Sequence, residues 1–167
     1  FVEMRFKPMP QYTQGALIVP NQKGSPVGKM FIQPKVLTDA GTTVLLDEVI
    51  GENFAIIAWG CDPTWGLTAE QIAQWKALGT RFIQVLPDVQ LRVPSDAGPD
   101  VIRVGDCTGR LKEWFALGTS SVALVRPDRF VAGLAIPQTV GQACDELARA
   151  LKALPQPAAS AVVSKVA

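Results

Sequence analysis

The sequence predicts an α/β fold in which helices cover both faces of a mixed β-sheet. From residue 43 onward, short apolar runs alternate with segments of helical periodicity, and this alternation is typical of α/β domains. A β-hairpin signal near residue 127 interrupts the alternation, so part of the sheet should be antiparallel. The 167 residues are 48% hydrophobic and 19% charged, which is sufficient for one domain with an apolar core.

Residues 1–42 differ from the rest because proline and glycine recur throughout them. Proline fixes φ and lacks a backbone donor, so it interrupts regular strand pairing. We expect an extended arm with short strands at Ala16–Val19 and Lys29–Ile32. The alternative is a linker that follows an upstream domain.

Four elements are expected between residues 43 and 86: a helix over Thr43–Ile50, a strand over Phe54–Trp59, a helix from Thr68 to Leu78 and a strand over Arg81–Leu86. Gly51 and Gly79 follow the two helices, as glycine often does at a helix C-terminus. Thr68 can cap the second helix because Gln71 occupies the reciprocal capping-box position. The Phe54–Trp59 run is apolar throughout, as in a strand buried on both faces.

Five more elements follow a polar loop at residues 87–100: a strand over Val101–Val104, a helix over Gly109–Leu117, strands over Val122–Val125 and Arg129–Leu134, and a helix that begins after Thr139. Thr108 can cap the first of these helices, and Gly118 ends it. Pro127-Asp128 favours a tight turn between the two strands. The last helix has one apolar stripe in steps of three and four residues. Its members are Val140, Ala143, Cys144, Leu147, Leu151 and Leu154. We therefore place a domain at residues 43–154 and a flexible tail at residues 155–167.

The order of these elements is that of thioredoxin, and the turn after Phe54–Trp59 lies where a thioredoxin carries two cysteines. Cys61 is followed three residues later by Thr64, so the C-x-x-C pair is missing. Dithiol exchange needs a second sulfur to resolve the mixed disulfide. Ser120-Ser121 also stand where thioredoxins place a cis-proline. The sequence thus predicts a thioredoxin-like scaffold without thioredoxin chemistry.

Cys61 is the one candidate catalytic residue. A helix N-terminus near it would lower its pKa and favour the nucleophilic thiolate. The sequence contains no histidine to act as a base, and no resolving cysteine is near. We therefore expect Cys61 to be a partly buried, unreactive thiol, and Cys107 and Cys144 to be loop and core residues. The cysteines match no zinc spacing, so no metal site is expected.

Two arginines and the tryptophans give weaker binding signals. Arg126 and Arg129 flank the hairpin turn and could hold a carboxylate. Solvated turn charges, with Asp128 shaping the turn, are the simpler interpretation. The tryptophans could form a stacking platform, but their spread over several elements favours core and interface packing. They are Trp59, Trp65, Trp75 and Trp114.

Charge and composition exclude several classes of partner. The net charge is +1 and no block of like charges occurs, so neither nucleic acid nor an anionic membrane surface is an expected partner. No apolar run reaches the ~18 residues of a membrane span, and the first residues do not form a signal peptide. The three cysteines fit no disulfide framework, which favours the reducing cytoplasm. Since residue 1 is not methionine, we expect the chain to be a piece of a longer protein.

Three stretches of the sequence resemble one family of enzymes. They are Gly28-Lys-Met-Phe-Ile-Gln-Pro-Lys-Val36, Leu45-Leu-Asp-Glu-Val-Ile-Gly-Glu-Asn-Phe-Ala-Ile-Ile57 and Val125-Arg-Pro-Asp-Arg-Phe-Val-Ala132. In this order they resemble the C-terminal region of FAD-dependent aromatic-ring monooxygenases of the 3-(3-hydroxyphenyl)propionate hydroxylase type. Residues Met4 to Tyr12 resemble the join between the flavin-binding part and that region.

The resemblance implies a parent protein with two parts. Its N-terminal part would bind FAD and NAD(P)H and insert one oxygen atom from O₂ into a phenolic ring. This chain would be the C-terminal part, a non-catalytic domain that binds neither cofactor. It would pack against the upstream FAD-binding domain and contribute to a homo-oligomer, with Phe31 and Ile32 as exposed contacts. Gly105-Asp106 resembles a flavin-ribose pair, but we interpret it as a turn.

Two alternatives from other classes remain open. One is a free-standing thioredoxin-like thiol protein that uses Cys61, which rapid modification by a thiol reagent at neutral pH would favour. The other is a pure interaction module, which a self-contained gene starting near Phe1 would favour.

Overall fold

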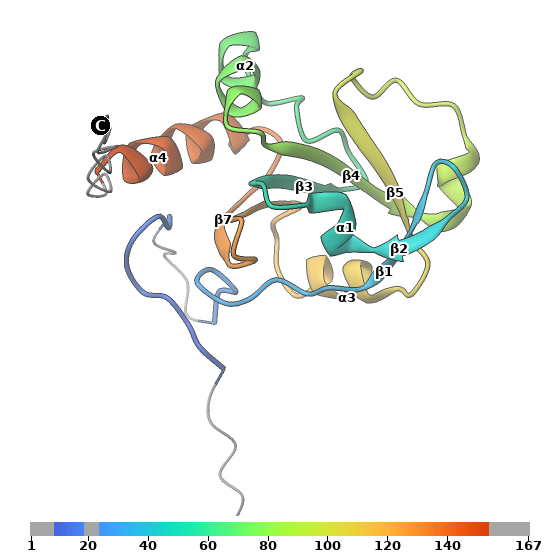
Figure 1. Ribbon diagram of the computed structural model, residues 1–167, viewed down its shortest axis with the longest axis horizontal. Helices are drawn as coiled ribbons and strands as arrows, with labels where there is room; N and C mark the ends of the chain where they lie inside the picture. The colour runs from blue at the N-terminus through green and yellow to red at the C-terminus, as the bar shows by residue number, and fades with distance from the viewer. Residues whose placement is uncertain (1–8, 19–23, 154–167) are drawn as a thin grey trace, which may run out of the picture.

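The computed structural model describes residues 9–18 and 24–153, and Figure 1 shows them as one sheet with helices on both sides. The seven strands are β1 (Lys35–Thr38), β2 (Thr43–Leu45), β3 (Ala55–Trp59), β4 (Arg81–Pro87), β5 (Val101–Asp106), β6 (Val122–Val125) and β7 (Val131–Ala135). The helices are α1 (Leu46–Ile50), α2 (Ala69–Ala77), α3 (Arg110–Ala116) and α4 (Val140–Ala153), with a 3₁₀ turn, η1 (Asp88–Arg92). The strand order in the sheet is β2-β1-β5-β4-β3-β6-β7.

The sheet is mixed, as the sequence predicts. Its centre is parallel, since β4 pairs in parallel with both β3 and β5. Each parallel pair needs a long crossover connection, which α2 and the η1 loop provide. The two margins of the sheet are antiparallel. On one side β6 pairs with β3 and β7 pairs with β6; on the other, β1 pairs with β5 and β2 pairs with β1.

The centre of the sheet is the core of the domain. Every residue of β6 is buried, and so are the first four residues of β3. Figure 1 shows α2 and α4 above the sheet and α3 below it. Trp75 of α2 packs edge-on against Phe54 with the ring centres 5.8 Å apart, and Phe115 of α3 lies 6.4 Å from the ring of Trp59. Strands covered on both faces are apolar throughout, which explains the continuous apolar run.

Several local predictions are confirmed. Thr68 and Gln71 form a capping box at the start of α2, and the Gln71 amide also donates to the Asp145 carboxylate of α4 over 2.9 Å. The expected hairpin joins β6 to β7. The described part of the α4 stripe faces the core, with Cys144 and Leu147 at 0% and 1% exposure. Leu154 and the tail at residues 155–167 lie outside the described residues.

Two expectations about the first 50 residues are wrong. Thr43–Leu45 is a strand that pairs with β1, and the helix begins only at Leu46. The β-branched side chains at residues 42–44 favour an extended backbone there. β1 itself lies within the segment that we expected to be an arm.

The expected arm strands are also absent from the described residues. Lys29 and Met30 form only isolated bridges, residues 16–18 are not a strand, and Val19 lies outside the described residues. The arm instead crosses the β6–β7 hairpin, where the Gly28 amide donates to the Val131 carbonyl over 2.8 Å. Four of its apolar side chains, Ala16, Leu17, Val27 and Phe31, are therefore part of the core.

Phe31 and Ile32 are consequently not the exposed contacts that we expected. Phe31 is 2% exposed, and Ile32 is half-buried and packs against the core. The Phe31 ring meets the Trp114 ring edge-on, with the centres 4.6 Å apart. Burying these side chains within the chain is favourable because it removes apolar area from water.

Thr108 does not cap α3, contrary to expectation. The N-terminal cap is Gly109 in a left-handed conformation, with φ of 72°. The Asp106 carboxylate accepts the Lys112 amide over 2.9 Å, so a side chain from the end of β5 satisfies one of the free helix donors. Gly105-Asp106 is thus the end of a strand rather than a turn.

Candidate functional site

The turn after β3 brings Cys61 next to the start of β6. The Trp59 amide donates to the Ser121 carbonyl over 2.8 Å, and the Gly60 amide donates to the Val85 carbonyl over 2.8 Å. The Ser121 side chain lies close enough to the Cys61 thiol to lower its pKa. These are the two positions at which the sequence departs from thioredoxin, and the fold places them in contact.

The surroundings of Cys61 do not activate its thiol. Burial raises the pKa of Cys61 above its ordinary value; the nearby Ser121 side chain lowers it, and the Asp62 charge raises it further. No helix begins at this turn, because α2 starts only at Ala69. The thiolate is the nucleophilic form, so a raised pKa makes Cys61 a poor nucleophile at neutral pH.

Asp62 is the buried charge of this turn, and it shapes the backbone. It is 3% exposed. One carboxylate oxygen accepts the Thr64 amide over 2.7 Å and the Thr64 hydroxyl over 2.6 Å. The other accepts the Gly98 amide over 2.9 Å. These bonds are typical of an aspartate that stabilises a turn, and the Asp-Pro-Thr sequence was the available signal for this role.

A cavity of about 440 Å³ lies beside Asp62 and Trp65, beneath the loop that joins β4 to β5. Arg103 of β5 donates to the Leu91 and Val93 carbonyls over 2.9 and 3.0 Å, which holds one end of that loop. Asp62 holds the other end through Gly98. Gln84 lines the cavity, and its Oε1 atom has no hydrogen-bond partner among the described residues.

The other two cysteines occupy the environments that the sequence predicts. Cys107 is exposed in the turn after β5. Cys144 is 0% exposed on α4. Burial, and to a smaller extent the charge of Asp145, raises the pKa of Cys144 to about 12. None of the three cysteines is in a disulfide.

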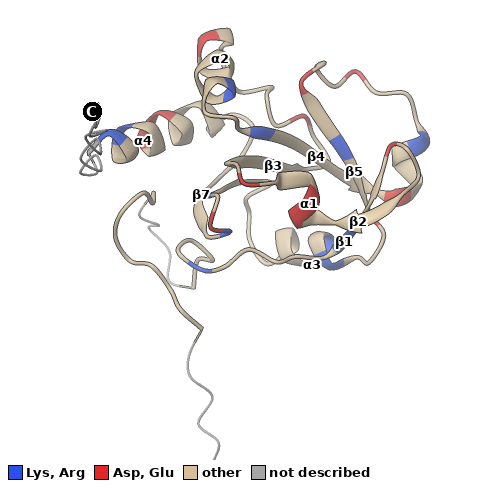
Figure 2. Cartoon of the chain, in the orientation of Figure 1, with Lys and Arg blue, Asp and Glu red and all other residues tan. Residues whose placement is uncertain are grey.

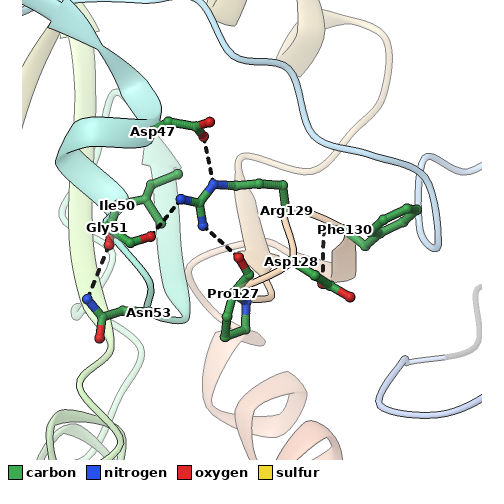
Figure 3. A network of polar contacts seen from close by, with 8 residues as sticks. All are labelled: Asp47, Ile50, Gly51, Asn53, Pro127, Asp128, Arg129 and Phe130. Carbon is green, nitrogen blue, oxygen red and sulfur yellow. Dashed lines mark hydrogen bonds and ion pairs between the residues drawn. The ribbon is translucent and has the colours of Figure 1, made fainter.

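Arg129 belongs to a polar network rather than to a solvated turn, which corrects our expectation (Figure 3). Its Nε donates to the Asp47 carboxylate over 2.6 Å, and its terminal nitrogens donate to the Gly51 and Pro127 carbonyls over 2.6 and 2.9 Å. Arg129 has φ of 70°, a left-handed conformation that costs a non-glycine residue about 1–2 kcal/mol. The network therefore joins the hairpin to α1 while holding a strained residue.

Arg126 differs from Arg129, because it pairs with Asp128 within the turn. Its guanidinium also lies 4.9 Å from the centre of the Tyr12 ring. Neither arginine is positioned to hold a free carboxylate, since each already binds an aspartate.

The tryptophans form no common platform. Trp75 is 1% exposed, Trp59 and Trp114 pack against the core, and Trp65 is 68% exposed. Figure 2 shows acidic and basic residues interspersed over the described elements. Within residues 9–18 and 24–153, no cluster of three or more potential ligands could hold a metal ion. None of the described helices is both long enough and apolar enough to cross a membrane.

The Gly105-Asp106 pair does not fit a flavin. A Cβ at Gly105 would lie 3.0 Å from the Asp88 backbone, so the strand is packed closely at this point. Asp106 is 7% exposed, and its carboxylate already caps α3. Its other oxygen accepts the Thr108 hydroxyl over 3.3 Å, so both carboxylate oxygens already have partners within the chain.

The fold and the turn after β3 define a thioredoxin-like domain that lacks the paired cysteines. A solved thioredoxin-like protein from Bacteroides caccae superposes with a TM-score of 0.56 at 15% identity, over 71% of this chain and 49% of that one. The flavin-containing structure of aklavinone-11 hydroxylase gives a TM-score of 0.58 at 17% identity, over 86% and 26%. At these identities the likeness concerns the fold alone.

The sequence comparison identifies the family. Residues 28–150 match the model of the HcaD C-terminal domain, and the chain belongs to this family. It is 62% identical over 149 residues to a 3-(3-hydroxy-phenyl)propionate/3-hydroxycinnamic acid hydroxylase from Klebsiella pneumoniae, covering 89% of this chain and 27% of that protein. A hydroxylase of the same name from Escherichia coli is 56% identical over 168 residues, covering 100% and 30%. The chain thus spans less than a third of the length of these relatives.

Proposed function

We propose that this chain is the non-catalytic C-terminal domain of a flavin-dependent hydroxylase that acts on 3-(3-hydroxyphenyl)propionate or a similar phenol. The identity of 62% over 89% of the chain, to a hydroxylase more than three times as long, is the observation that supports this most directly. FAD and NAD(P)H are cofactors of the upstream part, and O₂ is its oxidant. The free cysteines are compatible with a reducing cytoplasm.

A non-catalytic role agrees with the geometry of the described residues. The Cys61 thiol has a raised pKa, both carboxylate oxygens of Asp62 accept hydrogen bonds within the chain, and the carboxylate of Asp106 is bonded within the chain in the same way. The alternative of a thiol protein requires an activated Cys61, and the raised pKa counts against it. We propose further that the domain stabilises the upstream part and that the parent is a homo-oligomer.

The experiment compares the parent polypeptide with this chain alone. In the parent we expect bound flavin and NAD(P)H oxidation that depends on 3-(3-hydroxyphenyl)propionate, both unchanged by Cys61→Ser. The 167-residue chain alone should show no flavin absorbance after incubation with FAD and removal of the unbound FAD. Flavin binding by the isolated chain, or loss of parent turnover in Cys61→Ser with normal folding, would contradict the proposal. An upstream reading frame without a flavin-binding part would also contradict it.

A further inference from the structure

We infer that one apolar surface of this domain, formed by Tyr12, Met30, Trp114 and Leu117, is where the upstream catalytic part of the parent polypeptide docks. We call it the arm–α3 surface. The inference rests on the proposed function and adds the face that meets the partner. It replaces the expected contacts Phe31 and Ile32, which the fold buries.

The arm–α3 surface combines exposed apolar side chains with a groove. Leu117 is 86% exposed, Tyr12 45% and Met30 44%. A groove of about 280 Å³ lies between the end of α3 and the arm, where Met30, Trp114 and Leu117 line it together with Pro26 and Lys29. Exposed apolar side chains gathered around a groove indicate an interaction surface.

The surface is continuous and fixed by the fold. Met30 forms a bridge with Phe130, and the Tyr12 ring meets the Phe130 ring edge-on at 4.5 Å. Trp114 meets the buried Phe31 ring at 4.6 Å. The Tyr12 and Trp114 rings are therefore held in place before any partner arrives, which reduces the entropy lost on docking.

Gly28 allows this arrangement. Its φ is 80°, and the Tyr12 carbonyl oxygen would lie only 2.0 Å from a Cβ at this position. The Tyr12 amide donates to the Gly28 carbonyl over 2.8 Å. Only glycine permits such a close approach in the left-handed conformation, and the contact pairs Tyr12 with the segment that leads into Met30.

The upstream part is the occupant that the chain lengths favour. The 168 aligned residues make up 30% of the Escherichia coli relative, so about 390 of its residues lie outside this domain. Because the family is a C-terminal domain, that polypeptide would lead into Met9–Tyr12 and therefore lie next to the arm–α3 surface. Tethering at this position raises the effective concentration of the upstream part there.

The charges of the surface specify the chemistry of the partner. Lys29 lines the groove and makes no ion pair within the described ranges. Arg126, above the Tyr12 ring, is already paired with Asp128. The docking face should therefore be apolar with one carboxylate opposite Lys29.

A second exposed face provides the control. Trp65 and Val93 are 68% and 57% exposed beside the larger cavity. That cavity lies on β4 and β5, and β3 and β6 stand between these strands and β7 in the sheet. Figure 1 shows β7 and β5 at opposite sides of the sheet. The polypeptide that leads into Met9–Tyr12 does not bring the upstream part to this second face. Trp65 and Val93 should therefore stay exposed in the parent.

Hydroxyl-radical footprinting of the parent and of the 167-residue chain tests the inference. We expect Met30 and Leu117 to be oxidised severalfold more slowly in the parent, whereas Trp65 reacts equally in both. Equal oxidation of Met30 in the two would overturn the inference. Protection that disappears when an oligomeric parent is diluted to monomers would also overturn it, because the occupant would then be a second copy.

Matched substitutions in the parent give an independent readout. Leu117→Asp should make limited proteolysis between the two parts severalfold faster, whereas Val93→Asp should leave it unchanged. Neither should alter the urea midpoint of the 167-residue chain, since both side chains are exposed. Equal proteolysis of the two variants would refute the assignment. If the wild-type parent contains bound flavin and shows substrate-dependent turnover, the proposed function stands. Equal oxidation of Met30 or equal proteolysis of the two variants would then contradict only the assignment of the docking face.

Discussion

Replacing Arg129 should destabilise the domain more than its place in a hairpin turn suggests. Its side chain donates to the Asp47 carboxylate and to the Gly51 and Pro127 carbonyls. Because the guanidinium is charged, each of these is a charge-assisted hydrogen bond, which contributes about 1.5–3 kcal/mol when it is fully shielded from water. The Asp47 side chain is 32% exposed, so water replaces part of what is lost. We expect Arg129→Ala to lower the free energy of unfolding by about 2–3 kcal/mol.

The backbone at Arg129 gives a sharper version of this prediction. Alanine keeps the strain of the left-handed φ, whereas glycine removes about 1–2 kcal/mol of it. Glycine also makes the unfolded chain more flexible, at a cost of about 0.4–1 kcal/mol. We therefore expect Arg129→Gly to be more stable than Arg129→Ala by about 0.5–1 kcal/mol.

Urea unfolding followed by tryptophan fluorescence measures these differences, provided that the slope with denaturant is unchanged. Arg126→Ala is the matched control, because its ion pair is local to the turn and should be worth less than about 1 kcal/mol. A loss below about 1 kcal/mol in Arg129→Ala would refute the reasoning. An Arg129→Gly variant less stable than Arg129→Ala would refute the part concerning φ.

Three further predictions concern packing and the thiols. Gly66→Ala places a Cβ 1.8 Å from the Pro137 carbonyl oxygen, so it should lower the free energy of unfolding, measured by thermal unfolding, by about 3 kcal/mol or more. Gly118→Ala is the control: it has open space around it and should lower that free energy by less than about 1 kcal/mol. A thiol reagent at neutral pH should modify Cys107 first, Cys61 more slowly than a free cysteine and Cys144 only on unfolding; rapid reaction of Cys61 would contradict its raised pKa. Because the pKa of Cys144 rises from 9.0 to about 12 on folding, the unfolded chain releases this proton first as pH rises. The stabilisation should be complete below pH 9 and decline towards pH 12, and Cys144→Ala should show a smaller decline in urea unfolding over that range.

Local signals in the sequence were sufficient for much of the fold. Thr68 with Gln71 predicted the start of α2, and Pro127-Asp128 predicted the hairpin between β6 and β7. The residues that form these features are close in sequence, so their chemistry can be recognised without the rest of the chain. The absence of a second cysteine three residues after Cys61 could likewise be recognised directly, because Thr64 stands there.

Long-range pairing accounts for the expectations that were wrong. Thr43–Leu45 is a strand because β1 lies beside it; its β-branched residues favour an extended backbone, but in so short a segment this preference is weak without the neighbouring strand. Arg129 and Asp47 are 82 residues apart, and nothing in the sequence pairs them. Asp106 caps α3 in place of Thr108 because β5 ends beside the helix.

The sequence by itself determined the class of the domain, the absence of a dithiol and the family resemblance. These depend on residue identity and spacing, which are fixed along the chain. Only the tertiary structure decided that Phe31 is core and that Met30, one residue earlier, faces solvent. Neighbouring residues of an extended segment point in opposite directions, so exposure depends on which face the rest of the molecule covers. The hairpin and α3 cover one face of the arm and leave the other free.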